Sequence, residues 1–146
     1  MKRTKEDKVF SDLIRLCHNF TCENCGYIDA EGQITYKTRS IHLSHFITRG
    51  NYQTRWDTRN GYCLCAVCHH YFEGRPSEHT EFVKNRIGQA ELDLLVLDSN
   101  TIRKWTTAEK ADLYEFYTLQ YKDVSIKRNS GNNRIITPIN YERSIY

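Results

Sequence analysis

The sequence predicts a small α+β domain with helices at both ends. Three observations favour this class: apolar residues recur at helical spacing near each end, the stretch "SIHLSHFI" has strand character, and two C-x-x-C pairs enclose it. The 146 residues, 39% of them hydrophobic, suit one domain with a modest core. We expect a single domain over 1–124, with its core at about 20–90, helical flanks at 4–17 and 91–124, and a loosely held basic extension at 125–146.

The first predicted element is a helix over residues 4–17. Thr4 with Asp7 is typical of a helix start, because the side chain of each can bond the backbone N–H of the other. Four apolar residues recur at helical spacing and should pack on the domain: Phe10, Leu13, Ile14 and Cys17.

Two cysteine pairs predict a metal site. Cys22 and Cys25 form one C-x-x-C pair, and Cys65 and Cys68 form another. In a reducing cytosol such pairs favour thiolate ligation over disulfides. Four thiolates at about 2.3 Å satisfy tetrahedral zinc and leave no position for water. We therefore expect a structural Zn²⁺ that ties a hairpin to the following helix.

The surrounding residues refine this expectation. Gly26 suits a tight turn after the first pair, and Gly32 separates a first possible strand from "SIHLSHFI". Cys63 competes with Cys65 as a ligand, but the C-x-x-C spacing favours Cys65. Cys63 and Cys17 are expected to be buried, reduced core residues.

Three further helices are predicted towards the C-terminus. One begins at Pro76 and stops at Gly88, and a short apolar one, "AELDLLVL", follows. Thr106 with Glu109 predicts the start of the last. Its stripe of apolar residues is either core or a partner-facing surface that allows a homodimer: Tyr114, Tyr117, Tyr121 and Val124.

Histidines beside the second cysteine pair predict chemistry. If Cys68 faces the zinc from a helix, His69 is rotated by about 100° and points away, with Glu73 on its own face. His45, near the end of the strand, could meet that face across a groove. A neutral imidazole there can take a proton from water, as a general base for phosphodiester hydrolysis must, while a nearby divalent cation stabilises the phosphate charge.

These residues resemble the HNH, or ββα-metal, endonucleases, in particular their zinc-containing phage members. "HLSH" followed by "LCAVCHHYFEG" is similar to Holliday-junction resolvases of the endonuclease VII type. The longer stretch "SHFITRGNYQTRWDTRNGYCLCAVCHHYFEG", continuing to "HTEFVKNRIG", is similar to phage recombination proteins of the NinG (Rap) type. Together the resemblance covers about residues 20–90.

The resemblance implies a ββα-metal core and a metal-dependent DNA endonuclease of phage or prophage origin, acting in recombination on branched or structured DNA. It implies His45 as general base, Asn60 as the residue that braces the intervening loop, and His69 as a ligand of the catalytic metal. His42 would help to bind metal or substrate, although it could also be a surface residue on the strand. Asn60 could alternatively form only an Asn-Gly turn.

One departure concerns the metal. Many members carry an acidic ligand directly before the general base, where this chain has Ser44. A hydroxyl is a poor ligand for Mg²⁺. Either His42 or Glu73 completes the site, with Mn²⁺ or Ni²⁺ tolerated, or catalysis is weak.

Basic residues suggest the partner. Lys and Arg number 21 against 18 Asp and Glu, and they gather at both ends, which suits a polyanion or simply solubilises the termini. Arg49, Arg55 and Arg59 could bind phosphates bidentately, although "TRW" could instead anchor Trp56. No signal peptide or membrane span is seen, so we expect a cytoplasmic protein with no membrane partner, in the bacterial host cytoplasm if phage-encoded.

Two other function classes stay open. One is a non-catalytic zinc module that binds DNA or a recombination partner, which Ser44 favours. The other is a site-specific nicking or homing enzyme, but no helix-turn-helix or zinc-finger reader is recognisable.

Overall fold

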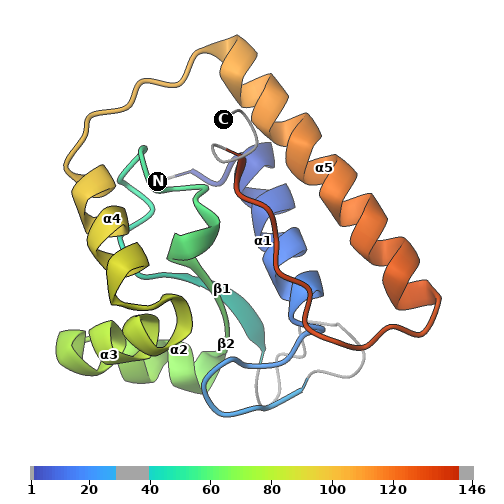
Figure 1. Ribbon diagram of the computed structural model, residues 1–146, viewed down its shortest axis with the longest axis horizontal. Helices are drawn as coiled ribbons and strands as arrows, with labels where there is room; N and C mark the ends of the chain where they lie inside the picture. The colour runs from blue at the N-terminus through green and yellow to red at the C-terminus, as the bar shows by residue number, and fades with distance from the viewer. Residues whose placement is uncertain (1, 29–39, 142–146) are drawn as a thin grey trace.

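The computed structural model describes residues 2–28 and 40–141 (Figure 1). Within these residues the chain forms five α-helices, one 3₁₀ turn and a two-stranded antiparallel sheet, so the predicted mixture of helix and sheet is confirmed. In chain order the elements are α1 Lys5–Cys17, β1 Ile41–His45, η1 Thr58–Asn60, β2 Gly61–Cys65, α2 Ala66–Phe72, α3 Pro76–Ile87, α4 Gln89–Ser99 and α5 Thr107–Asn129.

The hairpin forms across the long loop between "SIHLSHFI" and the second cysteine pair. β1 pairs with β2, with Ile41 opposite Cys65 and His45 opposite Gly61. All five residues of β2 are buried, because α1 and α2 both pack against it. A short, continuous apolar run such as "GYCLC" suits a strand covered on both faces. Gly32 and most of the first possible strand lie outside the described residues.

Helix α1 forms one wall of the core. It begins as predicted: the Asp7 N–H donates to Thr4 Oγ1 at 3.3 Å, and the Thr4 N–H donates to Asp7 Oδ2 at 2.8 Å. Its four predicted core residues are fully buried. Helix α5 lies alongside α1 (Figure 1), and the Tyr117 ring centre is 5.4 Å from that of Phe10. The two helices therefore support the hairpin from one side.

The C-terminal boundary differs from the prediction. Helix α5 continues to Asn129, and the chain then turns back across α1 (Figure 1). Arg128 donates to the carbonyl oxygens of Leu16 and Cys17 at 2.8 and 2.9 Å, and the Ile136 N–H also donates to the Cys17 carbonyl at 2.9 Å, so the returning chain is bound to the end of α1. Tyr141 is buried. The segment predicted to be a loose extension therefore belongs to the domain as far as residue 141.

The tyrosine stripe of α5 is partly internal. Tyr117 is 0% exposed and Val124 4%, whereas Tyr121 is 37% exposed. The Tyr117 hydroxyl donates to the Trp56 carbonyl at 2.6 Å. The two buried residues belong to the core. Dimerisation therefore stays a prediction, and only the exposed part of the stripe could contact a second subunit.

The remaining helices follow their predicted signals. Pro76 opens α3, Gly88 stops it at φ +84°, and α4 follows directly. Thr106 and Glu109 form the predicted capping box of α5. Within residues 2–28 and 40–141, none of the helices has both the length and the apolar character needed to cross a bilayer.

Candidate metal centre and histidine groove

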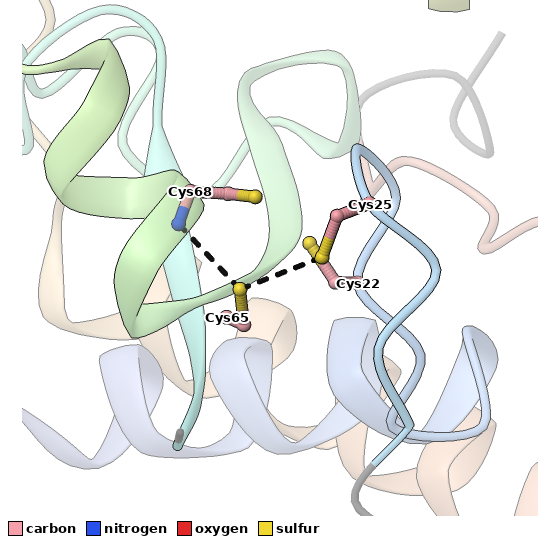
Figure 2. Close-up of side chains that lie close together, drawn as sticks. All are labelled: Cys22, Cys25, Cys65 and Cys68. Carbon is pink, nitrogen blue, oxygen red and sulfur yellow. Dashed lines mark hydrogen bonds between the residues drawn. The ribbon is translucent and has the colours of Figure 1, made fainter. Parts of the chain in front are cut away.

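The four predicted ligand cysteines lie together (Figure 2). Their sulfur atoms are all within 4.8 Å of one another, and those of Cys25 and Cys65 are 3.7 Å apart. Tetrahedral zinc with bonds of about 2.3 Å needs sulfur–sulfur distances of about 3.8 Å. All four are free thiols. The cluster can therefore hold a structural metal ion such as zinc.

Two local structures present these thiols. Cys22 and Cys25 belong to a turn that Gly26 completes at φ +79°, a conformation that glycine adopts without strain. Cys65 ends β2 and caps α2, where its sulfur accepts from the Cys68 N–H at 3.5 Å. The cluster thus joins the turn after α1 to the end of the hairpin and the start of the helix.

Cys63 and Cys17 stay outside the cluster, as predicted. Both are fully buried. Burial raises the pKa of both thiols, that of Cys17 to about 12. Because the thiolate is the reactive form, these two cysteines are inert core residues.

The three histidines of the predicted catalytic set line one groove, called here the histidine groove. It has a volume of about 420 Å³ and runs between α1, β1 and α2. Its wall includes three histidines and three arginines: His42, His45, His69, Arg3, Arg15 and Arg49. Imidazoles that can exchange protons therefore lie beside cations that can bind phosphate.

The geometry around His45 defines its tautomer. Its Nε2 lies 2.9 Å from the Arg55 carbonyl oxygen, and a carbonyl only accepts, so Nε2 donates. In a neutral imidazole this places the free lone pair on Nδ1. Burial lowers the pKa of His45 below its ordinary value of 6.5, which favours the neutral ring at pH 7. His45 is therefore a base with one nitrogen ready to accept a proton.

His42 and His69 meet edge to face. Their Nδ1 atoms are 3.3 Å apart and their ring centres 5.5 Å apart. Burial, and next the nearby His69, lower the pKa of His42, which keeps its nitrogen available. Two nitrogens that bind one cation at about 2.1 Å lie about 3.0 to 3.4 Å apart. The pair therefore fits two ligands of a single divalent ion.

The histidine pair offers fewer ligands than the cysteine cluster. In the described part of the chain, the cysteines alone bring three or more metal-ligating side chains together. An ion on His42 and His69 would take its other ligands from water or substrate, as Mg²⁺-type sites commonly do.

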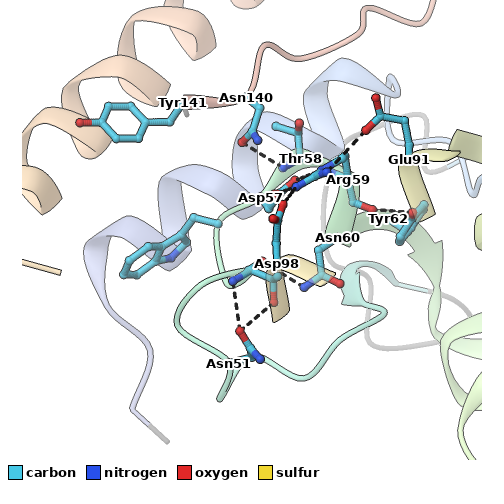
Figure 3. Close-up of polar contacts among 12 residues, drawn as sticks. Asn51, Asp57, Thr58, Arg59, Asn60, Tyr62, Glu91, Asp98, Asn140 and Tyr141 are labelled. Atoms are coloured by element: carbon cyan, nitrogen blue, oxygen red, sulfur yellow. Dashed lines mark hydrogen bonds and ion pairs between the residues drawn. The ribbon is translucent and has the colours of Figure 1, made fainter. Parts of the chain in front are cut away.

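Asn60, labelled in Figure 3, braces the loop that follows His45. It is fully buried. Its Oδ1 accepts from the Ile47 N–H at 2.6 Å, and its Nδ2 donates to the carbonyls of Ile47 at 2.9 Å and Thr54 at 3.0 Å. Gly61 is extended at φ −114°, so Asn60 does not simply form an Asn-Gly turn.

Two of the predicted phosphate contacts are instead bound inside the protein. Arg55 is 2% exposed, and its Nε and Nη2 donate to Asp7 at 2.8 and 2.6 Å. Arg59 pairs with Asp57 and with Asp98, each at 2.7 Å (Figure 3). Because these carboxylates already neutralise both guanidiniums, we assign Arg55 and Arg59 to the internal structure and not to DNA contact.

Glu73 and Ser44 also lie apart from the groove wall. Glu73 caps the end of α2 and pairs with His70 at 3.3 Å, and both side chains are mostly exposed. Ser44 is 2% exposed. His42, and not Glu73, is therefore the side chain that the structure brings to His69.

Three charged residues of the groove wall were not predicted as site residues. The sequence indicates Asp7 only as part of a helix start, Arg3 only as part of a basic terminus, and Arg15 not at all. Asp7 reaches the site through Arg55, 48 residues later, and no local pattern indicates a contact across that distance.

Comparison of the chain with models of protein families, with curated proteins and with solved structures finds no significant match. The function is therefore inferred from the motif residues and from the geometry of the two sites.

Proposed function

We propose that this protein is a metal-dependent DNA endonuclease of the HNH type, with β1, β2 and α2 as its ββα-metal core. The observation that carries the proposal is the histidine groove, in which a neutral His45 with a free Nδ1 shares a wall with the paired His42 and His69. A general base beside a divalent-ion site is the minimum that hydrolysis of a phosphodiester needs.

The chain's own groups support a hydrolytic mechanism. His45 Nδ1 takes the proton of a water that attacks the phosphorus in line. The bond to the 3′ oxygen breaks, and that oxygen takes a proton from the solvent, which leaves a 5′-phosphate and a 3′-hydroxyl. Arg3 and Arg49 hold the flanking phosphates, whereas Arg15 already pairs with Asp12 at 2.6 Å. A divalent ion held by His42 and His69 would stabilise negative charge on the scissile phosphate and the departing oxygen.

The cysteine cluster has a separate role in this proposal. We assign it to Zn²⁺, because four thiolates close the coordination sphere and leave no position for water or substrate. The zinc would therefore hold β2 and α2 against the turn after α1, and through them the positions of His45 and His69.

The substrate that fits best is branched or otherwise structured DNA, such as a recombination intermediate of a phage. The groove offers arginines, which can bind backbone phosphates, and such contacts carry no base sequence. Recognition by DNA shape is therefore favoured. A pair of subunits would suit symmetric cutting of two strands.

A non-catalytic zinc module that binds DNA or a recombination partner is the second candidate. One observation favours it: Ser44 is buried where related enzymes carry an acid, and the carboxylate in the groove wall, Asp7, is occupied by Arg55. Cleavage itself separates the two functions.

The deciding experiment compares a labelled four-way junction, a matched linear duplex and a supercoiled plasmid. With two imidazole ligands, we expect cleavage in the order Ni²⁺, then Mn²⁺, then Mg²⁺, at least about tenfold slower with Mg²⁺ than with the best ion, and none in EDTA. His69→Ala should abolish it, whereas His70→Ala, at an exposed neighbour, should not. Binding without cutting under every metal would support the module instead.

The arginines give a second test. Arg49→Ala should lower the slope of log affinity against log salt by about 1, because one phosphate contact is lost. Arg59→Ala should leave that slope unchanged and lower the free energy of unfolding by about 3 to 5 kcal/mol, because Asp57 is left buried without its partner. Fluorescence anisotropy at several salt concentrations and urea unfolding measure the two effects. An equal loss of slope in Arg59→Ala would contradict its internal assignment.

A further inference from the structure

Asp7 is a buried carboxylate whose acceptor positions are filled. Its Oδ1 accepts from Arg55 Nε at 2.8 Å and from Trp56 Nε1 at 2.9 Å. Its Oδ2 accepts from Arg55 Nη2 at 2.6 Å, from the Thr4 N–H at 2.8 Å and from the Thr4 hydroxyl at 3.2 Å. Burial alone would raise the pKa of Asp7, but these hydrogen bonds outweigh it and hold that pKa well below its usual range.

Because these positions are filled, Asp7 cannot act as a metal ligand in the groove wall. An ionised carboxylate has about four lone-pair positions, and five donors from Thr4, Arg55 and Trp56 already use those of Asp7. A metal ion would have to displace Arg55, which is 2% exposed and would be left buried without its carboxylate. Asp7 is therefore not the missing acidic ligand of the His42–His69 site.

Its position relative to His45 gives Asp7 another role. The carbonyl that receives the His45 Nε2 proton belongs to the peptide unit between Arg55 and Trp56. The side chains on both sides of that peptide bind the same carboxylate, 48 and 49 residues earlier in the chain. One acid of α1 thus clamps the peptide unit from both ends.

We propose that Asp7 is a positioning residue for the general base: by clamping the Arg55–Trp56 peptide, it holds the carbonyl that keeps His45 in the Nε2–H tautomer and leaves Nδ1 as the acceptor. A base in the opposite tautomer presents a donor where the water must lose its proton. The nuclease centre would then depend on a helix outside the hairpin and α2. The effect on catalysis rests on the proposed function, whereas the effect on the His45 tautomer does not.

The test uses Asp7→Asn in the zinc-loaded full chain. The asparagine side chain keeps the shape of Asp7, but its NH₂ group meets donors of Arg55 or Thr4, so the clamp loosens. Nitrogen NMR of the His45 ring, read without substrate, should change from a single Nε2–H tautomer to a mixture. In cleavage, kcat should fall by about 10- to 100-fold, with KM changed by less than about twofold.

Two other variants separate positioning from stability. Thr4→Ala removes the helix cap that touches the same carboxylate but leaves the clamp intact, so the tautomer and kcat should both stay as in the wild type. Trp56→Phe removes one clamp donor while keeping a ring at that position, so it should shift the tautomer in the same direction as Asp7→Asn, by a smaller amount. It also serves if Asp7→Asn does not fold.

The outcomes are distinct. An unchanged tautomer in folded Asp7→Asn or in Trp56→Phe overturns the inference, whether or not the protein cuts DNA. A shifted tautomer with an unchanged kcat overturns its catalytic part. If the wild type does not cut at all, the nuclease proposal fails, and the tautomer shift alone decides whether Asp7 positions His45.

Discussion

Replacing His45 with alanine should reduce the rate of DNA cleavage by at least about 100-fold, the usual lower contribution of a general base. The loss should fall on the chemical step, because the ring takes the proton of the attacking water and does not hold the DNA. Affinity for the four-way junction should therefore stay within about twofold of the wild type. Single-turnover cleavage and anisotropy on the same preparation measure the two quantities.

His70→Ala is the matched control, since it removes the same ring from an exposed position near the groove. It should cut at the wild-type rate. A His45→Ala protein that cuts within about threefold of the wild type would remove His45 as the base. One that loses affinity together with cleavage would point to a binding role for the ring.

The same residue sets the acid side of the pH profile. Because burial lowers the pKa of His45 below 6.5, the neutral, accepting form persists as the pH falls towards 6.5 and is lost below it. The pKa of His42 is lowered as well, by burial and by His69, so the metal ligand is protonated in the same lower range. The cleavage rate should therefore hold from pH 7 to about 6.5 and fall only below it. An acid limb centred above pH 7 would contradict this assignment.

The elements that could be predicted from the sequence are those with local causes. Thr4 and Asp7 lie three residues apart and cap one helix, and the cysteine pairs each lie in one turn. Such signals depend on spacing alone, so they can be read without knowledge of the tertiary fold. The direction of His69, away from the cysteines, could be predicted for the same reason, since one residue along a helix means a rotation of about 100°.

The predictions that failed depended on distant partners. An arginine in a loop near a proposed site suggests phosphate contact. Nothing near Arg55 in the sequence indicates Asp7, and although Asp57 lies two residues before Arg59, its second partner Asp98 is 39 residues away. The polar composition of the C-terminal segment suggested a loose tail, yet Arg128 and Tyr141 hold it against the domain.

Replacing Cys65 with alanine should unfold the domain. Structural zinc contributes about 10 to 16 kcal/mol where folding and binding are coupled, and a domain of this size is stable by only about 5 to 15 kcal/mol. Losing one of four thiolates opens the coordination sphere, so most of that contribution disappears. We expect native mass spectrometry to show no zinc in Cys65→Ala and thermal unfolding to lose its cooperative transition.

Cys63→Ala is an unusually close control for that experiment. Both cysteines lie in β2, two residues apart, and both are 0% exposed, so the two variants delete the same buried thiol from the same strand. Cys63→Ala should keep one zinc per chain and lose only about 1 kcal/mol, the cost of a small cavity. If both variants kept zinc, or if both lost it, the difference assigned to the two thiols would be wrong.

Because Cys65 also begins the helix that carries His69, loss of zinc should remove the histidine groove with the fold. Cleavage should therefore vanish in Cys65→Ala, while Cys63→Ala still cuts.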